Sequence, residues 1–194
     1  AADRNAVAQS AGQTPIIFDT DFVMPPHDDG MALMLALQSP EIEILGITTV
    51  AGNESLETAT VDVLRMLEIA GQPEIPVYAG ADMPLVHQKS EYAVSHYGRW
   101  YSNEPPQAPP GGFAIRKAEE ESAVSFIVRT VLTSPGQVTI VAIGPLTNIA
   151  QAIRSAPEFA VGVKRLVIMG GAVAILPDGA GNITPNAEFN FWVD

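Results

Sequence analysis

The sequence predicts an α/β fold with an open, mostly parallel sheet and helices on both faces, similar in plan to a Rossmann fold. Short apolar runs alternate with longer segments that have helical periodicity. The apolar runs are continuous, which is typical of parallel strands buried on both faces. Hydrophobic residues make up 47% of the 194 residues and charged residues only 16%, so the chain has ample apolar surface for a core.

Each expected element in the first part of the chain has a local signal. The apolar run 15–18 predicts a buried strand, and residues 28–38 predict a helix that begins with carboxylates. Residues 42–50 predict a second strand, stopped by Ala-Gly-Asn. Residues 54–70 predict an amphipathic helix that a glycine ends, and residues 75–79 predict a third strand.

The strand–helix alternation resumes after a long, proline-rich excursion at residues 80–117. Residues 119–132 predict a helix and residues 137–143 a strand. Residues 145–155 predict a helix with proline in its first turn, and residues 165–169 a strand that two glycines end. Because the alternation continues, the excursion is expected to be a loop within one domain.

The domain is expected to span residues 14–194, after a flexible N-terminal segment at residues 1–13. The last residues, Phe-Trp-Val-Asp, are expected to lie inside an element, so a further C-terminal segment or a second chain is expected to complete the domain. The alanine-rich start without methionine favours a periplasmic or secreted protein after signal-peptide removal, with a trimmed, cytoplasmic chain as the alternative.

Charge and cysteine content exclude several classes of protein. The formal net charge is −12, so neither nucleic acid nor an anionic membrane is an expected partner. No apolar run approaches the roughly 20 residues of a membrane-spanning helix. Without cysteine, the chain has no disulfide, thiolate nucleophile or cysteine-ligated metal.

Four aspartates lie within eleven residues, at the end of the first expected strand and the start of the first expected helix: Asp19, Asp21, Asp28 and Asp29. Like charges that converge at a strand end need compensation, and no lysine or arginine occurs between Arg4 and Arg65. A divalent cation with oxygen ligands is therefore expected. The alternative is helix capping, but one aspartate would suffice for that.

A second polar cluster consists of Asn182, Glu188 and Asn190, and Asn53 follows another strand. Amides and a carboxylate suit a ligand with several hydroxyl groups, such as a sugar. A polar surface loop is the alternative interpretation. Because strand-end loops of a parallel sheet share one edge, we expect these segments to lie near the aspartates.

The motifs together resemble the inosine–uridine-preferring nucleoside hydrolases. The resemblance is carried, in family order, by residues 19–21 and 28–29, then by Thr-Thr-Val-Ala-Gly-Asn at 48–53 and Gly-Pro-Leu-Thr-Asn-Ile-Ala at 144–150. Met-Gly-Gly at 169–171, Asn182 and Ala-Glu-Phe-Asn at 187–190 complete it. It implies a nucleoside hydrolase-like fold, hydrolysis of ribonucleosides to free base and ribose in purine and pyrimidine salvage, a Ca²⁺ cofactor and a homo-oligomer.

The resemblance also implies roles for individual residues. Asp21 and Asp29 would ligate Ca²⁺ through their side chains and Ile143 through its backbone carbonyl. Asp21 would also be the base that activates a metal-bound water, while Asp19 would support the loop. The ribose hydroxyls would be held by Asp28, Asn53, Asn182, Glu188 and Asn190.

The sequence also departs from the family pattern. Six residues separate Asp21 from Asp28, more than the family usually has, and the base specificity is undetermined. His27, His96 and Tyr97 are the candidate acids for the leaving base. Two other functions stay open: a haloacid-dehalogenase-like phosphatase with Asp19 as nucleophile and Asp21 as acid/base, and a non-catalytic protein that binds a sugar or nucleoside.

Overall fold

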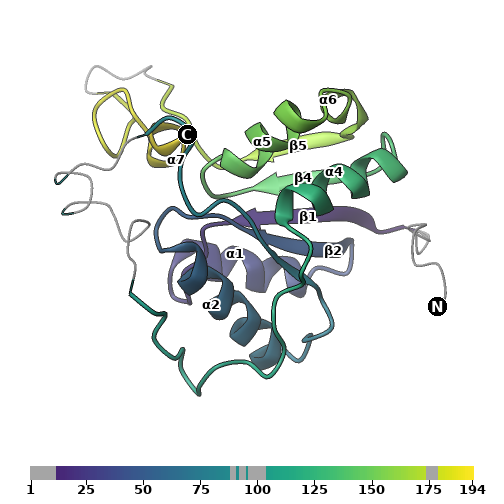
Figure 1. Ribbon diagram of the computed structural model, residues 1–194, viewed down its shortest axis with the longest axis vertical. Coiled ribbons are helices and arrows are strands. Elements are labelled where there is room, and N and C mark those ends of the chain that lie inside the picture. Colours follow the sequence, from purple (N-terminus) through teal and green to yellow (C-terminus); the bar gives the residue numbers. More distant parts are fainter. Residues whose placement is uncertain (1–11, 88–90, 92–94, 96–103, 174–178) are drawn as a thin grey trace.

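The computed structural model describes residues 12–87, 91, 95, 104–173 and 179–194. Its centre is one five-stranded sheet in the order β3-β2-β1-β4-β5, in which every neighbouring pair is parallel (Figure 1). The strands are β1 (Thr14–Thr20), β2 (Ile42–Thr49), β3 (Val77–Ala79), β4 (Thr139–Ala142) and β5 (Arg165–Ile168).

Helices cover both faces of this sheet, which confirms the predicted fold class. They are α1 (Asp28–Leu37), α2 (Leu56–Ile69), α4 (Ala123–Thr133), α5 (Thr147–Ser155), α6 (Phe159–Gly162) and α7 (Phe189–Val193). Figure 1 shows α1 and α2 on one face and α4, α5 and α6 on the other.

Alternate side chains of β1 explain the two layers. Ile16 and Phe18 pack into one core cluster with Leu33 of α1, whereas Ile17 packs into the other with Ile127 of α4. Successive side chains of a strand point to opposite faces, so a strand that is apolar throughout needs a cover on each side.

The predicted elements have the right type, and local capping shifts their ends. Ser55 Oγ accepts a hydrogen bond from the Thr58 amide at 3.3 Å, so α2 begins at Leu56 and not at residue 54. Ser122 caps α4 in the same way, so this helix begins after the predicted residue 119. The short helices α6 and α7 were not predicted.

Within the predicted excursion 80–117, the structure describes residues 80–87 and 104–117 as continuous stretches. Neither stretch contains a strand or helix. The N-terminal residues 1–11 lie outside the described part of the chain. None of the helices that the structure describes combines the length and apolar character needed to cross a bilayer.

The strand order reverses between β1 and β4. From β1 the chain runs outward through β2 to β3, and later returns to place β4 and β5 on the other side of β1. In open parallel sheets, ligands bind outside the carboxyl ends of the strands at such a switch point. The segments that follow β1 and β4 are therefore where a site is expected.

Candidate active site

Asp19 lies near the end of β1, in the middle of the sheet, and is fully buried. Its Oδ1 accepts hydrogen bonds from Thr48 Oγ1 on β2 and from Asn148 Nδ2 on α5, the latter at 2.8 Å. Burial raises the pKa of Asp19 to about 6, although both hydrogen bonds oppose the shift. The side chain thus connects β1 to the elements on both sides of it.

Asp21 follows β1 directly and is also fully buried. Its Oδ2 accepts a hydrogen bond from the Asn53 amide at 2.6 Å, whereas its buried Oδ1 has no hydrogen-bond partner among the residues that the structure describes. Burial raises the pKa of Asp21 well above its usual value, and the charge of Asp29 raises it further. A buried carboxylate oxygen without a donor is costly unless a ligand or cation meets it.

Two glycines make room for the Asp21 carboxylate. A Cβ on Gly52 would lie 2.2 Å from Asp21 Oδ2, and a Cβ on Gly144 would lie 3.0 Å from Oδ1. Both distances are shorter than ordinary van der Waals contact, so any larger residue would displace the carboxylate. The glycines of the segments after β2 and β4 therefore leave the space that the Asp21 carboxylate occupies.

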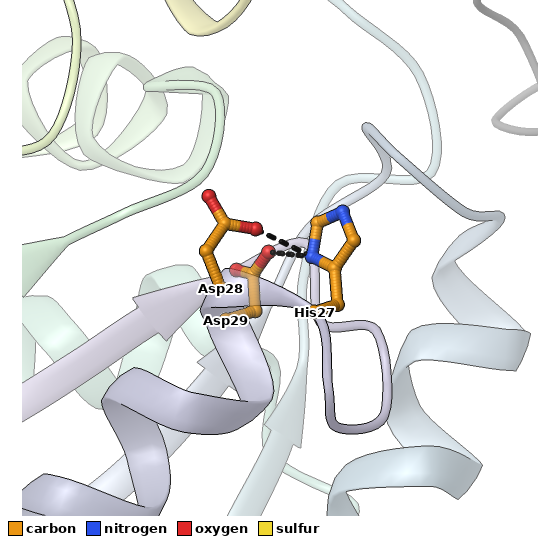
Figure 2. Close-up of side chains that lie close together, drawn as sticks. All are labelled: His27, Asp28 and Asp29. Atoms are coloured by element: carbon orange, nitrogen blue, oxygen red, sulfur yellow. Dashed lines mark hydrogen bonds and ion pairs between the residues drawn. The ribbon is translucent and has the colours of Figure 1, made fainter.

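Asp29 stands in the first turn of α1 and is buried, next to the exposed Asp28. Its Oδ1 accepts a hydrogen bond from Thr20 Oγ1 at 2.6 Å, and its Oδ2 lies 3.1 Å from His27 Nδ1. Burial raises the pKa of Asp29, and the charge of Asp28 adds to this. Figure 2 shows that His27 Nδ1 faces both carboxylates at once.

The backbone of Ile143, after β4, lies against the same site. Its amide donates to the Asp19 carbonyl at 2.8 Å. Its own carbonyl, the predicted metal ligand, accepts a hydrogen bond from Asn190 Nδ2 at 2.9 Å. A carbonyl oxygen has two lone pairs, so one remains for another partner. The same Asn190 nitrogen donates to the Met169 carbonyl at 2.9 Å, which leaves only Oδ1 of this amide for a sugar hydroxyl.

The other predicted sugar-binding residues have local partners around α7. Glu188 caps this helix: Oε1 accepts from the Asn190 amide at 3.0 Å, and Oε2 accepts from the Gly171 amide at 2.9 Å. Asn182 Oδ1 accepts from the Phe189 amide at 2.9 Å. The structure thus brings Asn190 to Ile143, whereas Glu188 joins Gly171 to the start of α7 and Asn182 bonds the first residue of that helix.

Sequence reasoning missed two buried or half-buried side chains near the site. Asn148 is fully buried, and its amide contacts Asp19, the Thr49 carbonyl and the Ala81 amide. A polar residue in the first turn of a helix with an apolar face was the available signal. Asp194 accepts from Thr147 Oγ1 at 2.7 Å and from the Leu85 amide at 2.6 Å. No local pattern could indicate contacts so distant in sequence.

The chemistry of the donor set fits a hard cation. Oxygen atoms of carboxylates and of one carbonyl are the ligands that Ca²⁺ and Mg²⁺ prefer. Within the described residues, no lysine or arginine forms an ion pair with Asp19, Asp21 or Asp29. Potential ligand atoms of His27, Asp28 and Asp29 lie within 4.8 Å of one another. Asp21 is not in this group, but its charge interacts with that of Asp29. Asp29 therefore links Asp21 to the group of His27 and Asp28.

The fold and this site together define a parallel α/β protein with a candidate metal centre at its switch point. The chain belongs to the inosine-uridine preferring nucleoside hydrolase family, whose model matches residues 16–194. This confirms the resemblance seen in the motifs. The candidate acids His96 and Tyr97 lie outside the described residues.

Similar proteins agree with the family assignment. Uridine nucleosidase 1 of Arabidopsis thaliana is 44% identical over 92% of this chain and 50% of its own length. The pyrimidine-specific ribonucleoside hydrolase RihA of Salmonella enteritidis PT4 is 43% identical over 93% of this chain and 54% of its own. A solved plant nucleoside hydrolase, PpNRh1, is 36% identical with a TM-score of 0.73, over 93% of this chain and 54% of its own. This chain therefore spans about half the length of these relatives.

Proposed function

We propose that the protein hydrolyses the N-glycosidic bond of ribonucleosides to free base and ribose, with Ca²⁺ as its cofactor. The observation that carries the proposal is Asp21: a buried carboxylate at the switch point, with one oxygen that has no donor within the described part of the chain and with Asp29 close enough to raise its pKa. The family and the relatives support the reaction class.

Cleavage of this bond builds positive charge on the sugar ring, and negative groups around the ring stabilise that charge more than they stabilise neutral substrate. Asp21 accepts a proton from the attacking water and so acts as the general base. Asp28, Asn53 and the three polar residues around α7 hold the ribose hydroxyls.

Asp21, Asp29 and the Ile143 carbonyl would hold the Ca²⁺, and Asp19 would support the loop through its bonds to Thr48 and Asn148. When bound, the cation would lower the pKa of a water and orient it toward the sugar. Hard oxygen ligands without sulfur or a second histidine favour Ca²⁺ or Mg²⁺ over zinc. Three ligand groups are fewer than the six to eight oxygens that Ca²⁺ usually takes, so further ligands complete the shell.

The test is nucleoside hydrolysis with controlled metal content. The purified protein is stripped with EDTA, supplied with Ca²⁺ or Mg²⁺, and assayed for ribose released from uridine and inosine. We expect Asp21→Asn to lower kcat by roughly 100-fold or more, the range for loss of a general base. Glu120→Gln removes the same charge at an exposed site and serves as the control.

Other results would contradict the proposal. Activity of Asp21→Asn at the wild-type level, or full activity of wild type in excess EDTA, would refute the assigned mechanism. Uridine binding without ribose release would favour the non-catalytic protein, and hydrolysis of an aryl phosphate would favour the phosphatase. The family match favours neither alternative.

We also propose that β5 contacts further polypeptide. The match covers only about half the length of the relatives, which is consistent with this proposal. Leu166, Val167 and Ile168 of this edge strand are 39%, 43% and 38% exposed, although parallel strands are normally covered on both faces. The occupant would correspond to the part of the relatives outside the match. Mass spectrometry of the intact protein tests whether further polypeptide is present, and light scattering tests whether the protein is a homo-oligomer. Cell fractionation tests the periplasmic or secreted location.

A further inference from the structure

His27 stands in the spacer that distinguishes this chain, immediately before α1, and its backbone is held on both sides. Its amide donates to the Met24 carbonyl at 3.2 Å, and its carbonyl accepts from the Met31 amide at 3.0 Å. The spacer also packs tightly on the helix, because a Cβ on Gly30 would lie 2.5 Å from Pro25 Cδ. The imidazole therefore projects from a well-fixed position.

The side chain of His27 does not cap the helix that it precedes. Its Nδ1 lies 2.6 Å from Asp28 Oδ1 and 3.1 Å from Asp29 Oδ2, while Nε2 lies on the far side of the ring (Figure 2). Ionised carboxylates only accept hydrogen bonds, so Nδ1 carries the proton when Asp28 and Asp29 are both ionised. Nδ1 is thus hydrogen-bonded to Asp29 and also lies at ion-pair distance from Asp28.

The second oxygen of Asp29 is held from another direction by Thr20. Asp29 therefore has a donor on each oxygen, one from β1 and one from the spacer. Asp28 is 68% exposed at its side chain, and His27 is its one hydrogen-bonding or ionic partner within the described residues. Without this donor, the charges of Asp28 and Asp29 would repel each other, and the exposed carboxylate would be free to rotate.

We propose that His27 is a positioning residue whose Nδ1 contacts both Asp28 and Asp29 and so joins the sugar-binding and the metal-binding halves of the site. The inference rests on the proposed function, in which Asp28 binds ribose and Asp29 binds the cation. Donors that orient metal-ligating carboxylates raise metal affinity because less order has to be imposed when the cation binds. Here His27 also orients the Asp28 carboxylate before the ribose hydroxyls bind.

Three substitutions test this role. In His27→Asn, the amide nitrogen stands as far along the side chain as Nδ1 does. In His27→Gln it stands in the place of Nε2, and His27→Ala removes every donor. Ca²⁺ affinity is measured by titration calorimetry without nucleoside, and kcat and KM for uridine are measured at saturating Ca²⁺. Thermal unfolding of the metal-free variants reports the effect of each substitution on the fold.

We expect His27→Ala and His27→Gln to weaken Ca²⁺ binding by about 10-fold to 100-fold, the usual effect of losing such a partner. Their KM for uridine rises more than their kcat falls, because Asp28 acts on the bound sugar. His27→Asn recovers most of the Ca²⁺ affinity and of the KM. A residue that only stabilised the fold would shift the unfolding temperature without this pattern.

The inference is overturned if His27→Ala binds Ca²⁺ as wild type does, or if His27→Asn is as impaired as His27→Ala. If either result is found while the wild-type protein hydrolyses nucleosides, only the role of His27 is refuted and the proposed function stands. A wild-type protein that binds Ca²⁺ in a His27-dependent way but releases no ribose refutes the proposed function and supports the metal-positioning role. A wild-type protein that binds no divalent cation refutes both.

Discussion

Gly52→Ala is expected to disable the site while leaving the fold largely intact. The glycine lies in the segment after β2, and its Cβ would fall 2.2 Å from Asp21 Oδ2, the oxygen that accepts the Asn53 amide. Its φ is not in the left-handed region, so alanine adopts the same backbone. The substitution therefore tests steric contact with Asp21, which supplies the three nearest atoms.

The size of the effect follows from the displacement. Ordinary contact begins near 3.4 Å, so the carboxylate has to move by about 1 Å, a misplacement that can cost on the order of 100-fold in rate. This equals about 2.7 kcal/mol of transition-state stabilisation. Overpacking of this kind costs about 1–3 kcal/mol of folding free energy.

The assay compares kcat/KM for uridine and Ca²⁺ affinity in wild type, Gly52→Ala and Gly162→Ala. The last is a matched control in α6, where the new Cβ would meet only Val131 Cγ1, at 3.1 Å, among contacts shorter than 3.4 Å. Urea unfolding checks that each variant is folded. If Gly52→Ala kept wild-type kcat/KM and Ca²⁺ affinity, the position of Asp21 would not determine activity, and the reasoning would be refuted.

Two further predictions concern stability. Asn148→Ala removes three buried hydrogen bonds, including one to Asp19, and should lower the free energy of unfolding by about 3–5 kcal/mol in urea titrations. The exposed Asn186→Ala is its control, and equal losses in both variants would contradict the prediction. Burial, and then the charge of Glu54, raise the pKa of Asp62 in α2 from 3.8 to about 6. The folded state therefore binds this proton more tightly, and the stability that Asp62 contributes is present below pH 4 and lost as the pH rises through 6. Asp62→Asn should thus be more stable than wild type at pH 7 and equal to it below pH 4; a difference independent of pH would refute this.

The sequence by itself determined the α/β class and the position of the acidic cluster. Both depend on local order: a continuous apolar run such as 15–18 is typical of a strand buried on both faces, and an aspartate directly after it is expected near the carboxyl end of that strand. Helix ends such as Leu56 also have local causes, because a serine before the helix caps it. The family motifs added the expected roles of Asp21 and Asp29.

Only the tertiary structure decided which strands meet and what surrounds each carboxylate. Strand order places β4 beside β1, so Ile143 and Asn148 reach Asp19 across more than a hundred residues of sequence. The unpartnered oxygen of Asp21 is likewise invisible in the sequence, since it depends on burial and on the absence of a donor from the described elements around it. The role of His27 depends on how the spacer folds back on α1, and no spacing rule predicts the direction of an imidazole. The types of the site residues and their order follow from the local sequence. Their pKa values, positions and contact partners depend on the packing of the folded chain.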